Sequence, residues 1–388
     1  MSAQGIYAQT WTLLSSGTSL NLYAAWATSV DTCYVTGDNG IIKSTNQGAS
    51  WSTQTVGEPA FRSLYFINSN TGFLAGGTAN PSPISYIYKT ISAGTSWTLQ
   101  HSSSPNGLYS VRFLNSSTGY SVGGAPGSGL IFKTTNGGTS WTPQTSSVAQ
   151  WLFDVAVIDG NTALCVGYNG CIQKTTNGGT TWASVSSSTS NILHSICFPS
   201  ALTGYIAGEN GTILKSINGG NSWTTQNIGS SENFWSVYFL NDLNGFIVGT
   251  NGTIIHTTDG GATWTPQSSG STSTLINVFF LNQNLGYVCG GNGTIIKYTN
   301  DIGIDEVENN FNVSIYPNPT NDIVNIEIPN VNEPVNINIF DLEGKLIYSL
   351  HNVRDKNTVL NLKDFSSGEY IMELKNSKIQ KVIKLNIL

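Results

Sequence analysis

Up to about residue 300, short apolar runs alternate with polar, glycine-rich turns, and the same order of segments recurs along the chain. One complete unit has apolar or alternating runs at 235–239, 244–249 and 252–257, followed by a turn and Trp264. Runs this short, with this alternation, are typical of β-strands rather than of helices. A further strand-like run ends at Gln267, so each unit is predicted to hold four short strands.

A polar turn of constant form precedes the tryptophan of each unit. The pattern [Ser/Thr]-x-[Asp/Asn]-x-Gly-x-x-Trp occurs at 44–51, 134–141, 175–182, 216–223 and 257–264, and residues 90–97 keep the frame with Ser92 at the third position. The acid or amide can bond back to its own turn, the glycine tolerates positive φ, and the tryptophan needs an apolar slot. A motif present in six copies is not a single active site. We therefore predict a structural role for Asn46, Trp51, Trp97, Asn136, Trp141, Asn177, Trp182, Asn218, Trp223, Asp259 and Trp264.

The spacing of these tryptophans predicts the architecture. They follow one another at intervals of 46, 44, 41, 41 and 41 residues, and four-stranded units of this length are typical of β-propeller blades. A seventh unit, 276–297, lacks the tryptophan and its strand, whereas Thr10–Leu13 matches Ser96–Leu99. We therefore expect an all-β fold, a seven-bladed propeller closed by the N-terminal strand, because closure removes a free sheet edge.

The turns between the second and third strands differ among the units. Five are Asn-Gly, at 39–40, 169–170, 210–211, 251–252 and 292–293, and Asn-Gly favours a type I′ hairpin because both residues need positive φ. The other two units have longer connections at Gly76–Tyr86 and Gly123–Leu130. Because these two units are adjacent, we expect longer loops that form one raised side of the propeller.

One position varies where the rest of the unit repeats. It lies at the entry to each inner strand, on the face of the second-to-third-strand turns, and holds mostly aromatic residues. Loops on a rigid scaffold often carry function, and aromatic residues with an arginine and a histidine suit a sugar ring or a protein. The alternative is that they only plug the channel. The candidate ligand-binding residues are Tyr23, Arg62, Tyr109, Phe153, His194 and Trp235, with Ile276 at the seventh position.

Charge divides the chain near residue 300. Only 10% of the 388 residues are charged; residues 1–300 hold 8 Lys+Arg and 9 Asp+Glu, and residues 301–388 hold 8 and 13. We expect the propeller at 1–300, an acidic linker at 301–310, and a small Ig-like β-sandwich at 311–388. The sandwich strands are predicted at 323–328, 335–340, 346–350, 358–362, 370–374 and 382–387.

The other chemistry-bearing residues are interpreted as structural. The five cysteines lie at strand positions and suit a core rather than a disulfide framework, although Cys165 and Cys171 share a hairpin. The histidines are dispersed, so no metal site and no cofactor are expected. Lysines at one third-strand position are expected to send their amines to solvent, with an anionic polymer as the alternative ligand. The near-neutral propeller also argues against nucleic acid.

The C-terminal segment resembles a known family. Its motifs are Tyr316-Pro317-Asn318-Pro319, then Gly344-Lys345, Gly368 with Tyr370, and Lys381 with Lys384. In this order they are similar to the type A sorting domain of the type IX secretion system of Bacteroidota. The resemblance implies secretion machinery as the partner of residues 311–388, export to the medium or the cell surface, and cleavage near the domain. It also implies a signal peptide, which this chain does not show at Met1, and we expect that the chain lacks it. No apolar run is long enough for a transmembrane segment.

The propeller resembles the Asp-box (BNR-like) repeats of photosystem II stability/assembly factor-like proteins, over about residues 7–300. The resemblance implies the fold, but that family has an arginine-rich patch, and this propeller has only Arg62 and Arg112. Two arginines are too few for the carboxylate clamp of sialidases, which also carry Asp-boxes.

Two functions stay open. The first is a secreted or cell-surface, non-enzymatic module that binds a glycan or protein ligand. The second is a polysaccharide-degrading enzyme, a glycoside hydrolase or lyase, with its site at the channel mouth. Such an enzyme needs a pair of carboxylates across the cleft, and the sequence shows no clear pair. We favour the binding module and expect no catalytic residue.

Overall fold

The structure is a computed structural model that describes residues 8–301, 313–328, 333–341, 344–376 and 380–388, apart from 39, 55, 58–59, 78–83, 104–105 and 126. Residues 9–300 and residues 301–388 fall into separate compact units. Apart from Asp301, the linker expected at 301–310 lies outside the described residues. No helix in the described ranges has the length and apolar character needed to cross a membrane.

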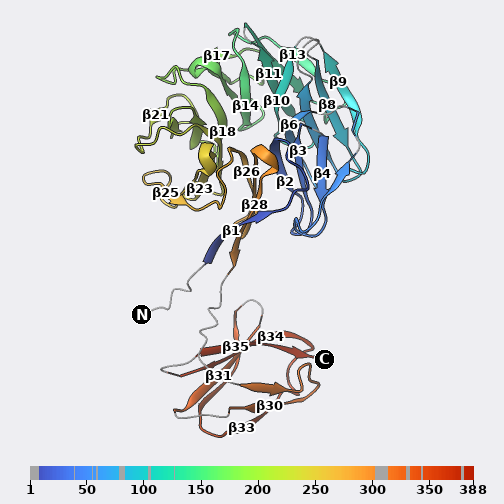
Figure 1. The fold of residues 1–388 in the computed structure, drawn as a ribbon, viewed down its shortest axis with the longest axis vertical. Helices are drawn as coiled ribbons and strands as arrows, with labels where there is room; N and C mark the ends of the chain where they lie inside the picture. Colours follow the sequence, from blue (N-terminus) through green and yellow to red (C-terminus); the bar gives the residue numbers. More distant parts are fainter. Residues whose placement is uncertain are drawn as a thin grey trace. The chain divides into compact units, whose positions relative to one another are not determined.

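The first unit consists of four-stranded antiparallel sheets that follow one another around a ring (Figure 1). Blade 1 contains β2 (Leu22–Ala27), β3 (Cys33–Gly37), β4 (Gly40–Ser44) and β5 (Ser52–Gln54). Blade 2 contains β6 (Phe61–Phe66), β7 (Gly72–Gly77), β8 (Ser85–Thr90) and β9 (Thr98–Ser103). Blade 3 contains β10 (Gly107–Phe113), β11 (Gly119–Ala125), β12 (Ser128–Thr134) and β13 (Thr142–Gln144).

The next three blades have the same order and shorter outer strands. Blade 4 contains β14 (Leu152–Val157), β15 (Ala163–Gly167), β16 (Ile172–Thr175) and β17 (Ala183–Ser184). Blade 5 contains β18 (Leu193–Cys197), β19 (Gly204–Gly208), β20 (Ile213–Ser216) and β21 (Thr224–Thr225). Blade 6 contains β22 (Phe234–Phe239), β23 (Gly245–Gly249), β24 (Ile254–Thr257) and β25 (Thr265–Gln267).

The seventh blade is shared between the two ends of the propeller sequence. Its strands are β26 (Leu275–Asn282), β27 (Leu285–Gly290), β28 (Ile295–Asp301) and, as outer strand, β1 (Ala8–Leu14). Trp11 packs edge-on against Phe280 at a centroid distance of 6.2 Å, as Trp264 packs against Phe239 at 5.9 Å. The prediction of seven blades closed by the N-terminal strand is therefore confirmed within the described residues.

The core of the propeller lies between neighbouring blades. The second strand of each blade is almost wholly buried; every residue of β15 and β23, for example, is buried. Its alternate side chains join clusters on both sides, so that Val248 of blade 6 packs with Val288 of blade 7. A strand covered on both faces must be apolar at successive positions, which explains the continuous apolar runs in the sequence.

The Asp-box turns are held by their own side chains. In blade 6, Asp259 accepts a hydrogen bond from the N–H of Thr263 (2.9 Å), and the Thr257 hydroxyl accepts one from the N–H of Gly261 (2.8 Å). The glycine is required for space as well as conformation: Gly138, the equivalent in blade 3, has φ 77°, and a Cβ there would lie 2.3 Å from Phe73 of blade 2. The motif thus fixes a turn against the preceding blade.

The repeated lysines connect each blade to the next. Lys215 donates to the carbonyl of Gly260 at 2.6 Å, and its amine lies 5.5 Å from the centre of the Tyr205 ring. The expectation that these amines point to solvent is wrong for the lysines of blades 1–5, which donate to a turn carbonyl, and for Lys297, which donates to Gln47 of blade 1. The reason is that the Asp-box turn of the next blade presents an acceptor within reach.

The Asn-Gly turns have the expected backbone. Asn and Gly both have positive φ at 169–170, 210–211, 251–252 and 292–293, whereas Asn39 lies outside the described residues. Three of these turns are single 3₁₀ segments, η1 (Tyr168–Gly170), η2 (Thr250–Gly252) and η3 (Gly291–Gly293). Each glycine N–H donates to the segment that precedes the next inner strand, as Gly170 does to the carbonyl of Asn191 at 2.9 Å. These turns and the strand entries therefore share one face.

The longer connection of blade 3 is an extended hairpin, whereas most of the longer connection of blade 2 lies outside the described residues. In blade 3, pairing continues past Gly123 and Leu130 to Ala125 and Ser128. In blade 2, pairing extends beyond Gly76 and Tyr86 to Gly77 and Ser85, and residues 78–83 lie outside the described residues. The expectation of a loop is therefore wrong for blade 3, because its backbone hydrogen bonds continue while the two antiparallel segments stay in register.

The second unit is a β-sandwich, as predicted. One sheet has the order β29 (Ser314–Tyr316), β30 (Ile323–Glu327), β33 (Asn357–Asn361). The other has the order β32 (Leu346–Val353), β31 (Val335–Phe340), β34 (Gly368–Lys375), β35 (Gln380–Ile387). Val324 of the first sheet and Ile337 and Met372 of the second belong to one buried cluster, so alternate residues of both sheets make the core.

Candidate functional site

A β-bulge at the start of every inner strand places one side chain at the mouth of the central channel. The register shifts between Leu22 and Ala24 in blade 1, and at the equivalent point in all six other blades. A bulge leaves one residue unpaired and redirects its side chain. The seven unpaired residues, here called the mouth ring, are Tyr23, Arg62, Tyr109, Phe153, His194, Trp235 and Ile276.

All seven mouth-ring residues line one cavity of about 210 Å³. Its volume is somewhat below that of a typical small-molecule site, which is about 300–1,000 Å³, so it suits one side chain or one ring. The structure therefore brings together every residue singled out from the sequence as a channel-mouth candidate. None of the described residues of the two extended hairpins lines the cavity.

The mouth ring is a chain of stacked groups. The rings of His194 and Trp235 stack at a centroid distance of 4.2 Å, and Phe153 follows at 5.6 Å from His194. Tyr109 packs edge-on against Phe153 at 5.3 Å. On the other side, the Arg62 guanidinium lies 3.9 Å from the centre of the Tyr23 ring. These contacts narrow the channel around the cavity that the same residues line.

His194 is neutral in this setting. Burial of its side chain lowers the pKa of His194 to about 4, because a charged imidazolium loses hydration there. Nε2 has no hydrogen-bond partner, and the nearest carboxylate oxygen, on Glu209, is 3.8 Å away. At neutral pH this contact is not a salt bridge, and His194 contributes a flat aromatic surface rather than a charge.

The residue after each bulge forms a second ring, here called the polar belt. Its members are Ala24, Ser63, Ser110, Asp154, Ser195, Ser236 and Asn277, and all line the floor of the cavity. Several accept a hydrogen bond from a backbone N–H of the next blade: Ser195 from Val237 at 3.3 Å, and Asn277 from Ala25 at 3.0 Å. The belt was missed by the sequence analysis, although six of its seven positions are polar within otherwise apolar strands.

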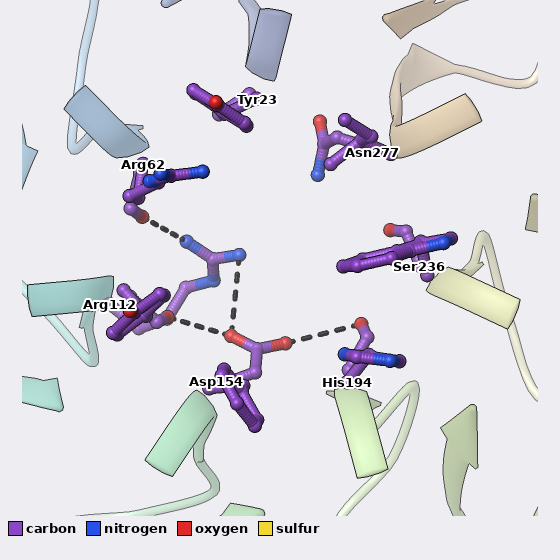
Figure 2. A pocket seen from close by; sticks show the side chains of 15 residues that line it. Tyr23, Arg62, Arg112, Asp154, His194, Ser236 and Asn277 are labelled. Carbon is purple, nitrogen blue, oxygen red and sulfur yellow. Dashed lines mark hydrogen bonds and ion pairs between the residues drawn. The ribbon is translucent and has the colours of Figure 1, made fainter. Parts of the chain in front are cut away.

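Asp154 is the centre of the belt and is 7% exposed. It accepts hydrogen bonds from the hydroxyl of Ser110 (2.7 Å), from the hydroxyl of Ser195 (3.2 Å) and from the N–H of Ile196 (3.1 Å). Arg112 lies 3.6 Å away and also donates to Ser63 at 3.2 Å. Figure 2 shows the Arg112 guanidinium reaching toward the middle of the ring of lining residues, beside Asp154.

A second cavity of about 250 Å³ lies on the other side of the belt. It is lined by the later residues of the inner strands, among them Trp26, Tyr65, Tyr238 and Phe279. Trp26 stacks on Phe279 at 4.4 Å. Both cavities are lined by Arg112 and by the belt residues Ala24, Asp154, Ser195, Ser236 and Asn277, so these residues lie at the boundary between the two halves of the channel.

The described residues that line the mouth cavity include few ionisable groups. Among the described residues, Asp154 is the one carboxylate that lines the mouth cavity, and no cluster of potential metal ligands occurs. All five cysteines, including Cys165 and Cys171, have free thiols. The arrangement offers aromatic faces, two guanidinium groups, hydroxyls and one amide.

The sorting-motif residues converge in the C-terminal sandwich. The Asn318 amide donates to the carbonyl of Lys384 (2.7 Å), and its oxygen accepts from the N–H of Asn386 (2.9 Å). Lys384 in turn lies 2.6 Å from Glu369, next to Tyr370. The early and late motifs, more than sixty residues apart in sequence, therefore form one contact; Lys345 instead stabilises a separate turn through the Asp341 side chain (2.8 Å).

Two family models match the chain. Residues 314–387 match the secretion system C-terminal sorting domain, which indicates export through type IX secretion to the cell surface or the medium. Residues 180–268 and 244–299 match the photosynthesis system II assembly factor YCF48. No curated protein matches the chain at the level of sequence.

Solved structures support the propeller fold. A structure of YCF48 bound to D1 peptide has a TM-score of 0.61 at 18% identity and covers 78% of this chain and 99% of its own. YCF48 from Cyanidioschyzon merolae has a TM-score of 0.60 at 16% identity, covering 74% and 98%. The GH74 enzyme of Niastella koreensis has a TM-score of 0.59 at 16% identity, covering 98% and 74%. At these low sequence identities, the similarity shows that the fold is shared and nothing more.

Proposed function

Since this chain joins a propeller similar to YCF48 to a secretion system C-terminal sorting domain, we propose that it is an exported, non-enzymatic binding protein. Its ligand enters the mouth cavity and contacts the mouth ring. The sandwich at 311–388 acts as the sorting signal and is removed or anchored once export is complete.

The main support for this proposal is the variation of side chains in the mouth ring. A bulge recurs at the same place in every blade, yet the side chain that it presents changes from blade to blade. A purely structural position in a repeat would hold similar residues, as the Asp-box does. That the similar propeller YCF48 has been solved with a D1 peptide supports a binding role.

A polysaccharide-degrading activity is less well supported. Glycosidases need two carboxylates on either side of the scissile bond, and Asp154 has no carboxylate partner among the described residues that line the cavity. Its oxygens are also occupied by two hydroxyls, a backbone N–H and Arg112. A carboxylate held this way is poorly placed to protonate a glycosidic oxygen.

The test is a glycan and protein array probed with the full chain, followed by calorimetry on the ligand found. The double variant Tyr109→Ala/Trp235→Ala should abolish binding while the melting temperature changes little, because both side chains are partly exposed at the channel mouth. The matched control is Trp151→Ala, an aromatic residue next to the ring that does not line the cavity. Unchanged affinity in the double variant would place the site elsewhere.

A further inference from the structure

The propeller contains two arginines, Arg62 and Arg112, and both line the mouth cavity. They come from different blades and from different positions of the inner strand, Arg62 from the bulge of β6 and Arg112 from the later part of β10. Figure 2 shows both side chains directed into the cavity. Arginine is the residue best suited to bind a carboxylate through paired hydrogen bonds.

The cavity carries one unmatched positive charge. Asp154 lies 3.6 Å from Arg112 and balances the charge of its guanidinium. The Nη1 group of Arg112 donates hydrogen bonds to the Ser63 hydroxyl and to the Val111 carbonyl. Arg62 has no carboxylate within ion-pairing distance among the described residues and is exposed above Tyr23. A guanidinium over an aromatic ring keeps its in-plane N–H groups available, so Arg62 can accept an anionic group.

Acidic residues around the mouth restrict that anion to one charge. Asp38 is bonded to the Tyr23 hydroxyl at 2.6 Å, and Glu232 to the Asn251 amide at 3.0 Å. Glu209 lies beside His194. These carboxylates would repel a polymer with a negative charge on every unit, since like charges repel. A ligand with a single carboxylate at its tip can pass them and reach Arg62.

The rest of the cavity favours a sugar ring over a peptide end. Proteins commonly capture a chain-terminal carboxylate with free backbone N–H groups, but here the N–H groups of Val111, Ile196 and Val237 are used by the polar belt. The His194–Trp235 stack offers a flat apolar wall, and the floor presents hydroxyls and the Asn277 amide. Flat faces with hydroxyl partners suit a ring that is apolar on its faces and polar at its edge.

We propose that the mouth cavity binds a terminal uronate, the sugar acid at the end of an otherwise neutral glycan. The carboxylate pairs with Arg62, and the ring lies against Trp235. This inference rests on the proposed function, since it names the ligand class of the same site.

The test is calorimetry of the full chain with short oligosaccharides that end in galacturonate, glucuronate or mannuronate. The matched neutral oligosaccharides, in which the same terminal sugar lacks the carboxylate, serve as ligand controls. We expect the neutral ligands to bind about tenfold or more weakly, and Arg62→Gln to weaken uronate binding by a similar factor. Arg354→Gln removes the same charge from an exposed residue of the sandwich and should leave the affinity unchanged.

Three results would overturn the inference: equal affinity for the neutral ligands, no effect of Arg62→Gln, or binding of none of the uronates. Binding only of peptides with a free C-terminal carboxylate, lost on amidation, would also overturn it. In each case an array ligand that still requires Tyr109 and Trp235 would leave the proposed function intact. If the affinity for the array ligand is unchanged in the Tyr109→Ala/Trp235→Ala variant, the proposed function fails instead.

Discussion

The Arg112 guanidinium and the Asp154 carboxylate lie 3.6 Å apart across the boundary between blades 3 and 4, in the middle of the channel. Each also bonds to a third blade, Arg112 to Ser63 of blade 2 and Asp154 to Ser195 of blade 5. Four consecutive blades are therefore connected through one partly buried ion pair, which lies at the boundary between the two channel cavities.

Replacing Asp154 with alanine should destabilise the propeller by about 3–5 kcal/mol, because Arg112 and the hydroxyls of the belt lose their partner in a buried site. The measurement is urea unfolding of the full chain, followed by tryptophan fluorescence. Asp259→Asn is the control, because four of the other Asp-box turns already use asparagine. A loss for Asp154→Ala no larger than that of the control would show that the ion pair contributes little.

Removing residues 1–14 should lower the melting temperature sharply or cause aggregation, because β28 would become an open edge. A finer variant is Trp11→Ala, which removes the contacts with Phe246 and Phe280 and should cost about 3–5 kcal/mol. Leu13→Ala, on the same strand but 49% exposed, should be nearly neutral. Equal melting temperatures for the truncated and full chains would contradict the shared blade.

The stability of the propeller should fall between pH 6.5 and 4 on account of His194. Its pKa is lowered from 6.5 to about 4 in the folded protein, so the unfolded chain binds a proton in this window that the folded protein does not. The contribution of His194 is complete above pH 6.5 and decreases toward pH 4, by up to about 3 kcal/mol. His194→Phe keeps an aromatic ring and should lose this part of the pH dependence.

Comparing the wild type with His194→Phe between pH 6.5 and 4 isolates the contribution of His194 to stability. Burial also lowers the pKa values of His101 and His256, but both residues are present in both proteins. Parallel stability curves for the wild type and His194→Phe would show that the imidazole is not shielded from water.

Removal of residues 311–388 should leave a folded propeller that stays in the periplasm of a host with type IX secretion. The reason is that the described sandwich has its own buried core and matches the sorting-domain family over 314–387. The measurement is the amount of protein in the medium and at the cell surface. Lys363→Ala, an exposed change within the sandwich, is the control. Normal export of the truncated chain would refute the assignment.

Most of the fold could be predicted from the sequence because its signals are local and repeated. The Asp-box turn contains its own donors and acceptors, as the bond from the Thr263 N–H to Asp259 shows, and the tryptophan spacing gives the blade length. Comparing equivalent positions in seven units also isolated the mouth ring, since a varying residue in a constant frame is visible without coordinates.

Contacts between blades were decided only by the tertiary structure. The lysine amines were expected in solvent, but ring closure brings the turn of the next blade to them, as with Lys215 and Gly260. Arg112 and Asp154 lie 42 positions apart in sequence, in strands that otherwise read as apolar, and their meeting depends on how far each blade rotates about the channel. The sequence by itself determined each blade, because a blade is built from neighbouring segments. The charge and shape of the channel depend on the closed ring of blades, because they arise where seven separate inner strands meet.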